Sequence, residues 1–596
     1  MAPAPAFRPT TPKGHGLMTP AADTRPDRPR RLSCPRWPRS VLGRVPGSLP
    51  LAAAARGAVA LALPLLVGLV TGWVVPSVIA AIGALWGVSQ DGADPYRVRV
   101  RRLGWTGVSS ALGLLAGELA LRSGHPTAVA VTMVAAALVA GGVSLRERIA
   151  SVSGMQLLLG VTIGSGIPVP GPWWQAPLAL LAGVALVLVL SAAPWLWRRH
   201  HVERAAVLAV YRSAGEALAV AGTDAAEQAR LRMTLALNHA HEVMAPHLAP
   251  RGRRRQDGAG ELVRAFHYAV RLGEAVTAVV WEGRALPPAL TGVPRHLAGR
   301  LLPDRLTAPE DRVAEPAPQT DSPGTRALAD LARVVDGEPD GADLQLRLPA
   351  RERPGRAARV RYALLLAGCV LASHLLAEVL HRPRGYWLPM TVAFVYKPDF
   401  GPLLPRALHR CVGTIVGVAA IGAVSAAATG TYAVVGVVAV FGALMAVGVR
   451  HHYALATLGL TAVVFVLLDL LGDHRALYGT RVVDTALASA LVLVAHFVVW
   501  PDSSEHRAEA QTEAAVAAAR RYRDAAPEAG PVQRQSLRRA AYHQLAEARR
   551  TVAHARREPA RRGRPLPDWE SAITAAERLC DQVTGQAVAG AASPAR

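Results

Sequence analysis

The sequence predicts an all-α polytopic membrane protein built from two parallel repeats of about six transmembrane helices, each followed by a cytoplasmic helical appendage. Of the 596 residues, 51% are hydrophobic and only 18% are charged, which is less charge than soluble chains usually carry. The apolar residues gather in two blocks, 51–197 and 359–500. Both blocks contain apolar runs of about 17–22 residues, the length that a membrane-spanning helix needs.

Each block offers six spans. Those of the first block lie near 53–71, 73–89, 103–121, 126–143, 150–167 and 176–197, and those of the second near 361–380, 386–402, 409–427, 432–449, 453–471 and 481–500.

The two blocks resemble each other. A shift of 306 positions matches 103–193 to 409–499 without a gap, and upstream the tryptophan of Trp73-x-x-Pro76 corresponds to Trp387. An even number of spans brings both copies into the membrane from the same side, so the repeat is predicted to be parallel.

The remaining segments are predicted from composition and helical periodicity. Apolar spacing in 198–285 and in 501–596 predicts a three-helix appendage after each block. The segment 286–358 is rich in Pro, Asp and Arg and is predicted to be a linker. Residues 1–50 are rich in Pro and Arg without an apolar signal region, which predicts a disordered tail.

Arginine sets the predicted orientation in the plasma membrane. Both tails are basic, and so are the loops predicted at 97–102, 146–148, 198–361, 397–410 and 450–452. The alternate loops are short and poor in charge, so both termini and both appendages are expected in the cytoplasm. The net charge of +23 is therefore assigned to topology and to anionic membrane lipids, and no nucleic-acid motif accompanies it.

No cofactor, metal site or enzyme chemistry is predicted. The four cysteines are scattered singly, at Cys34, Cys369, Cys411 and Cys580. They form no CxxC pair and no zinc spacing with histidine. The stretch HAHEVMAPH at 239–247 is not HExxH, so histidines on a helix surface are expected there, and no Walker motif appears.

The stretch RGYWLPMTVAFVYKPDFGPLLPR begins like a membrane span, with Tyr386 and Trp387 at the place of an aromatic interface belt. Its apolar run ends at Tyr396, after about eleven residues, which cover ~17 Å of a hydrocarbon core of ~30 Å. Pro398 cannot donate a backbone hydrogen bond and disfavours helix at the residues before it. We therefore expect the helix to end near Tyr396.

Two interpretations of this end stay open. The first is an ordinary cytoplasmic end of a short helix, with Lys397 reaching back to the interface. The second is a helix broken at membrane depth, which is tolerated where the backbone lines a polar cavity. In the second, Lys397, Asp399 and Arg410 line the cavity together with Tyr386 and Trp387. Lys397 or Arg410 would then attract a substrate carboxylate, and Asp399 would hold one of these cations.

Ionisable groups at the bilayer centre cost about 2.5–3.5 kcal/mol each, so those within the spans need a reason. They are Glu118, His374, Glu378, Asp469, Asp484 and His496. The carboxylates are either interfacial and paired with Arg122, Arg382 or Arg481, or they take part in proton coupling. His374 and Glu378, one helical turn apart, form the best candidate for a proton-binding pair, whereas His496 is expected to be a packing histidine.

The second block carries the motif YW-x-P-x-T-V-x-x-V-x-x-P-D-F/Y-G followed by R-x-x-G-T-x-x-G. It resembles the fusaric acid resistance protein-like family, also described as integral membrane bound transporters and aromatic acid exporters. The matching residues are Tyr386, Trp387, Pro389, Thr391, Val392, Pro398, Asp399, Phe400, Gly401, Arg410, Gly413, Thr414 and Gly417. The first block matches only in outline, because Asp91 stands where Asp399 would fall, without the surrounding Lys-Pro and aromatic-Gly.

The resemblance implies efflux of small organic, often aromatic, carboxylic acids across the plasma membrane by a secondary transporter. Some relatives work alone and others with periplasmic adaptor proteins, and a homo-oligomer is compatible with the sequence. Proton coupling is expected to supply the energy. Two alternatives stay open: a passive organic-anion channel of the same architecture, and a non-transporting scaffold whose appendages bind a partner.

Overall fold

The computed structural model describes residues 50–92, 94–196, 199–248, 259–302, 322–336, 355–397, 402–427, 430–472, 477–499, 504–557 and 568–592. Some predictions lie wholly or partly outside these ranges: the basic tail, apart from its last residue, the linker at 303–321 and 337–354, and the role of Asp399. Every regular element within the described ranges is helical, so the predicted all-α class is confirmed.

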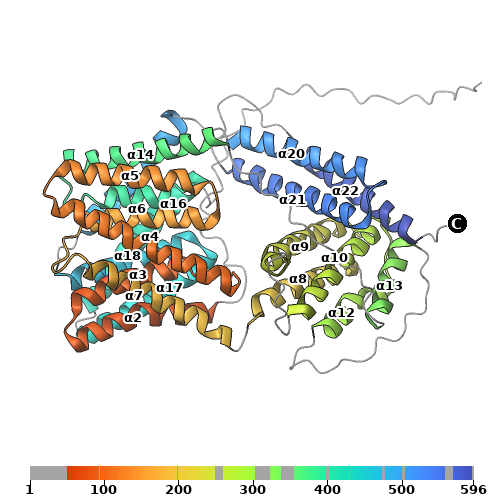
Figure 1. Ribbon diagram of the computed structural model, residues 1–596, viewed down its shortest axis with the longest axis horizontal. Helices are drawn as coiled ribbons and strands as arrows, with labels where there is room; N and C mark the ends of the chain where they lie inside the picture. The colour runs from red at the N-terminus through yellow and green to blue at the C-terminus, as the bar shows by residue number, and fades with distance from the viewer. Residues whose placement is uncertain are drawn as a thin grey trace, which may run out of the picture. The chain divides into compact units, whose positions relative to one another are not determined.

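The first membrane block contains six α-helices (Figure 1). They are α2 (Leu51–Thr71), α3 (Val74–Ser89), α4 (Tyr96–Arg122), α5 (Pro126–Ser144), α6 (Arg148–Gly164) and α7 (Gln175–Ala192), after which the 3-10 turn η1 (Ala193–Leu196) follows.

The second block repeats this number of helices. They are α14 (Arg356–Val379), α15 (Trp387–Val395), α16 (Leu403–Ala427), α17 (Thr431–His451), α18 (Tyr453–Leu470) and α19 (Tyr478–Val494), and a π-helical turn, η3 (Ala495–Val499), continues α19.

Eight of these helices are long and apolar enough to cross a membrane, namely α2, α5, α7, α14, α16, α17, α18 and α19 with part of η3. This confirms a polytopic membrane protein. The helices α3 and α6 are apolar but have only 16 and 17 residues. The helix α15 has nine residues, so it covers ~14 Å, about half of the hydrocarbon core.

The basic segment 97–102 is not the loop that the sequence predicts, because it forms the first turns of α4. Two carboxylates on the preceding loop hold it there. Arg99 Nε lies 3.5 Å from Asp91 Oδ1, and Arg102 is ion-paired with Asp94. Arginine is also a good helix former, so a cluster of arginines by itself does not mark a loop.

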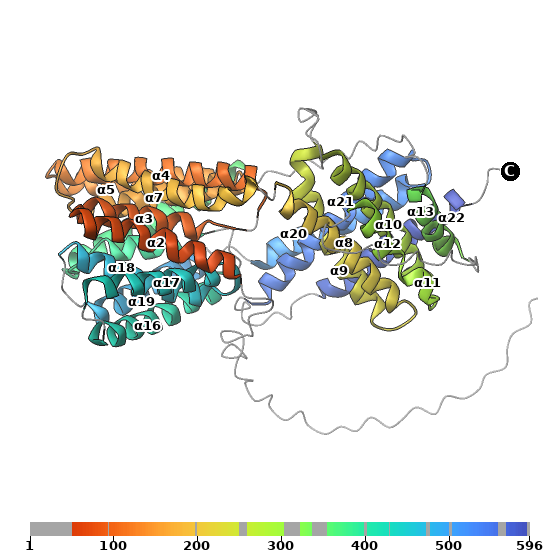
Figure 2. The same ribbon diagram turned by 90° about the horizontal axis from the view of Figure 1, so that it is seen from below.

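The two membrane blocks share one hydrophobic core. The helix α2 of the first block packs against α17 of the second (Figure 2), and α14 of the second packs against α5 of the first (Figure 1). A Cβ added to Gly57 would lie 2.7 Å from the Gly442 carbonyl oxygen, so only glycine allows α2 and α17 to approach so closely. The first helix of each block thus packs against the fourth helix of the other block. This pattern supports the predicted repeat, which remains a prediction.

The first appendage contains the three helices that the sequence predicts, α8 (His201–Ala219), α9 (Ala226–Leu248) and α10 (Ala259–Glu282). Within its stretch 239–247, His241 is buried and not on the surface as expected, and burial lowers the pKa of His241 to about 3.

Part of the predicted linker is also helical. It forms α11 (Pro288–Thr291), α12 (Val293–Leu301) and α13 (Pro323–Asp336). Leu297 and Leu328 from these helices are fully buried in the core of the first appendage. Their amphipathic spacing is short and lies among Pro and Asp residues, which is why composition alone suggested a linker.

The second appendage has the three expected helices, α20 (Ser504–Ala525), α21 (Pro531–Ala555) and α22 (Trp569–Ala592). Its helix α22 contacts α10 and α13 of the first appendage. Two ion pairs also connect the appendages: Nε of buried Arg230 in α9 lies 3.0 Å from Asp581 Oδ2 in α22, and Arg538 Nη1 in α21 lies 3.4 Å from Glu274 Oε1 in α10. The soluble ends of the two halves are thus joined by ion pairs as well as by apolar packing.

Candidate functional site

Trp387 is the first residue of the short helix α15 and is fully buried. Guanidinium carbons of Arg384 and Arg481 lie 4.8 Å and 5.0 Å from its ring centroid, and the ring of Phe465 lies 5.8 Å away. The two distances from the arginines are in the range of cation–π contacts. The predicted interface-belt position is therefore wrong for Trp387, because a belt residue would face the lipid, whereas this ring lies inside the protein.

Arg410 lies in the second turn of α16 and is 2% exposed. Its guanidinium carbon is 4.4 Å from the ring centroid of Phe394, near the end of α15. Its Nε and Nη2 atoms are buried and have no hydrogen-bond partner among the residues that the structure describes. Within the described ranges, no carboxylate lies at ion-pair distance from Arg410.

Arg481, at the start of α19, is also a buried arginine with an unsatisfied donor. It is 2% exposed, and its Nη1 is buried without a hydrogen-bond partner. Positive charge from Arg410 and Arg384 acts on its guanidinium. We call Arg384, Arg410 and Arg481 the arginine cluster. Like charges held together away from water are unfavourable unless an anion joins them.

A carboxylate lies beside this cluster, one turn further along α19. Asp484 is fully buried, and its Oδ1 accepts a hydrogen bond of 2.8 Å from Arg382 Nε. Its Oδ2 is buried without a hydrogen-bond partner. The pair with Arg382 is one of the pairings that the sequence left open.

The carboxyl end of α15 is held by side chains from other helices. The helix ends at Val395, next to the expected end at Tyr396. Arg406 Nη1 donates to the Val395 carbonyl at 3.0 Å and also to the Lys397 carbonyl, and the Tyr362 hydroxyl donates to the Tyr396 carbonyl at 2.6 Å. Carbonyl groups at a helix end need such partners when they are buried.

Among the predicted substrate-binding residues, Tyr386, Trp387, Lys397 and Arg410 are all buried. Lys397 is 8% exposed and so does not extend into bulk water. Trp387 begins α15, and Arg410 lies against Phe394 near the end of that helix.

The predicted proton-coupling residues are not all near this site. His374 is half-buried and Glu378 is exposed, and no described hydrogen bond or ion pair joins them. Asp469 is exposed at the end of α18. Asp484 is thus the predicted carboxylate that the structure places beside Arg481.

Two further ionisable residues have structural partners. Glu118 is buried, and its Oε1 accepts a 3.0 Å hydrogen bond from Arg122 Nε, which agrees with the pairing interpretation. His496, in the π-helical turn, is buried with its ring centroid 6.1 Å from that of Tyr396.

Arg384 and Arg481 were not among the predicted substrate-binding residues. In the sequence they appear only as exceptions to the charge bias or as partners for a carboxylate. One signal could have found Arg481: it stands at the start of an apolar span that also holds Asp484 and lies in the block with the family motif.

Residues 352–495 match a family model described as fusaric acid resistance protein-like. The inner membrane protein YccS of Escherichia coli is 26% identical over 255 residues, which are 43% of this chain and 34% of that protein. The uncharacterized membrane protein YvaC of Bacillus subtilis is 23% identical over 474 residues, 74% of this chain and 72% of that protein. The chain thus matches about a third of the length of YccS and most of the length of YvaC.

No solved structure matches the chain significantly. The matched range includes α15, Arg410 and all of the arginine cluster, together with Asp484. The second membrane block is therefore similar to the fusaric acid resistance protein-like family, and the resemblance predicted from the motif is confirmed.

Proposed function

We propose that this protein is a secondary transporter that exports small organic acids, with the arginine cluster as the site of the substrate carboxylate. One observation carries the proposal: Arg410 and Arg481 are buried, each lies against an aromatic ring, and each has buried N–H groups without an acceptor. Buried donors of this kind are prepared for an anionic ligand.

The chemistry of the residues favours a carboxylate attached to a ring. A guanidinium group binds a carboxylate through paired, charge-assisted hydrogen bonds. The faces of Trp387 and Phe394 supply apolar surface beside these cations, which suits the aromatic body of a small acid. Lys397 and Asp399, which follow α15 in the sequence, keep their proposed roles as an attracting cation and as the anion that positions it.

Asp484 is the proposed coupling group. While Asp484 is ionised, its charge is shared with Arg382 and stabilises Arg481 in the absence of substrate. A substrate carboxylate brings a second negative charge to the same arginines, which favours protonation of Asp484. Binding of the acid and uptake of a proton would thereby be linked. An acid anion and a proton that cross together carry no net charge, so this step is driven by the concentration differences of acid and proton and not by the membrane potential.

A passive anion channel is the second candidate, and two observations on the carboxylates favour it. Glu118 is already paired with Arg122, and Glu378 is exposed without a described bond to His374. Fewer residues are then available for a proton relay. Substrate flux that ignores a pH gradient would select the channel.

The test is a flux assay in proteoliposomes with a panel of aromatic acids, their neutral amides and a pH jump. We expect Arg481→Gln to weaken the apparent affinity for the acids by about tenfold or more, because a charge-assisted hydrogen bond is worth about 1.5–3 kcal/mol. The amides should be affected less. Arg356→Gln is the matched control, since Arg356 is exposed at the start of α14. Equal acid transport by the Arg481→Gln and Arg356→Gln proteins would contradict the proposed site.

A further inference from the structure

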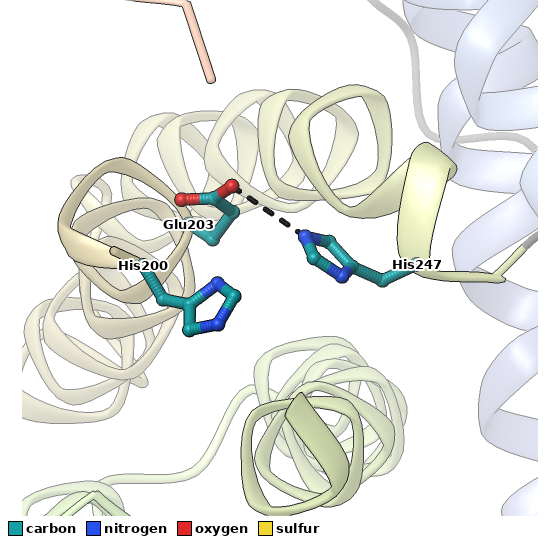
Figure 3. A group of neighbouring side chains, drawn as sticks. All are labelled: His200, Glu203 and His247. Atoms are coloured by element: carbon teal, nitrogen blue, oxygen red, sulfur yellow. Dashed lines mark hydrogen bonds and ion pairs between the residues drawn. The ribbon is translucent and has the colours of Figure 1, made fainter. Parts of the chain in front are cut away.

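Three side chains converge within the first appendage, His200, Glu203 and His247 (Figure 3). His200 directly precedes α8, Glu203 lies in the first turn of that helix, and His247 lies next to the last residue of α9. One ligand atom from each residue can be chosen so that all of them lie within 4.8 Å of one another. The turn between α8 and α9 thus brings His247 close to Glu203, which precedes it by 44 residues.

The polar atoms of this group are not satisfied by the protein itself. The Glu203 side chain is 5% exposed, and its Oε1 lies 3.5 Å from His247 Nε2. Its Oε2 is buried without a hydrogen-bond partner, as is Nδ1 of His200. In Figure 3 the carboxylate and the two rings surround a common space. A buried carboxylate oxygen without a donor is costly, unless a cation or a proton donor joins it.

We propose that His200, Glu203 and His247 bind a divalent transition-metal cation, with Zn²⁺ as the best match. Two imidazole nitrogens and one carboxylate oxygen form a ligand set that suits zinc, whereas calcium and magnesium prefer oxygen ligands alone. Metal–ligand bonds of about 2.0–2.2 Å at tetrahedral angles place neighbouring ligand atoms ~3.4 Å apart. The 3.5 Å separation of His247 Nε2 and Glu203 Oε1 has this value.

The third ligand, His200, has to move closer to the other two to complete the site. Side-chain rotation can supply such a shift, because the three ligand atoms already lie within 4.8 Å of one another. The fourth position would be taken by water. Positive charge from Arg199 acts on His200 and opposes a cation, so Glu203 is the residue on which the affinity depends most. The bound ion would join the beginning of α8, directly after the first membrane block, to the end of α9.

The competing explanation is a simple hydrogen bond between Glu203 and His247. The sequence did not reveal the site because its ligands follow no zinc motif: His200 and Glu203 are three residues apart, and His247 comes from the next helix. Only the helical hairpin brings them together.

The test uses the full chain, purified in detergent without a histidine tag and stripped with a chelator. Equilibrium dialysis against Zn²⁺, followed by elemental analysis, measures the ions bound per chain. We expect one saturable ion per chain, and at least about tenfold weaker binding in Glu203→Gln and in His247→Ala. His201→Ala is the matched control, because His201 neighbours His200 but is exposed. Bound Co²⁺ should show visible absorption bands in the parent and control proteins.

The absence of saturable binding would leave only the Glu203–His247 hydrogen bond and would overturn the proposal. Unchanged binding in Glu203→Gln would do the same, and so would an equal loss in His201→Ala, which would indicate non-specific histidine binding. Glu203→Gln keeps the size of the side chain, so it decides the matter if thermal melting shows that His247→Ala is misfolded. Zn²⁺ should also raise the melting temperature of the parent protein, but not that of Glu203→Gln.

Discussion

The two membrane blocks have the same number of helices but treat their buried charges differently. In the first block Asp91 accepts hydrogen bonds from Arg56 at 2.8 Å and 3.1 Å and lies 3.5 Å from Arg99. In the second block Arg410 and Arg481 have no described carboxylate at ion-pair distance. Arg56 and Arg99 of the first block therefore lie beside a carboxylate, whereas Arg410 and Arg481 of the second form the site that we propose for an anion from outside the protein.

Trp73 and Trp387, which correspond in the predicted repeat, also differ between the two blocks. Trp73 is 70% exposed before α3, and Trp387 is fully buried at the start of α15. The helix α3 has 16 residues and α15 has nine. The comparison teaches that two positions aligned in the predicted repeat can differ in burial, since one tryptophan is exposed and the other lies inside the protein.

The largest expected effect separates these two tryptophans. Trp387→Ala removes a ring that packs against Phe465 and two arginines, and such large-to-small changes cost about 3–5 kcal/mol. Trp73→Ala removes only exposed surface and should leave the protein stable. Thermal unfolding in detergent, followed by size-exclusion chromatography, measures both. A similar melting temperature for the two variants would show that the tryptophans are equivalent after all.

An intermediate effect is expected for the buried arginines. Arg99→Met leaves Asp91 with one partner fewer and should lower stability by about 1–3 kcal/mol. Arg410→Met replaces a buried cation that lacks a carboxylate, so stability should be unchanged or raised while acid transport is lost. The same melting assay combined with the flux assay checks this. A marked loss of stability in Arg410→Met would mean that Arg410 is structural.

The smallest expected effect on the fold concerns two buried carboxylates. Asp484→Asn should remove the pH dependence of transport, because the proposed coupling group can no longer titrate. Glu118→Gln should preserve this pH dependence, since Glu118 is paired with Arg122 and belongs to the first block. Transport rates at a series of external pH values compare the two proteins. Loss of pH dependence in Glu118→Gln alone would move the coupling site to the first block.

The sequence predicted the features that depend on local patterns. The end of α15 followed from the length of the apolar run and from Pro398, and the appendage helices followed from their periodicity. The family followed from the motif in the same region.

Other features depend on which helices become neighbours, and they were missed for that reason. Arg481 meets Trp387 because α19 packs against α15, and His247 meets Glu203 because α9 returns alongside α8. The arginines at 97–102 were assigned to a loop, because sequence alone did not show that Asp91 and Asp94 stabilise them within a helix. No local pattern contains these partners.

The π-helical turn η3, which continues α19, has a geometric consequence for Arg481 and Asp484. A π turn holds one residue more than an α turn. If this surplus residue were absorbed into regular α-helix, α19 as a whole would rotate by ~100° and advance by ~1.5 Å relative to the chain that follows the turn. Arg481 would then leave the face of Trp387, and Asp484 would leave Arg382, without any helix having to unfold. The helix that carries Arg481 and Asp484 is thus followed by a turn with one extra residue, enough for a single-step change of register.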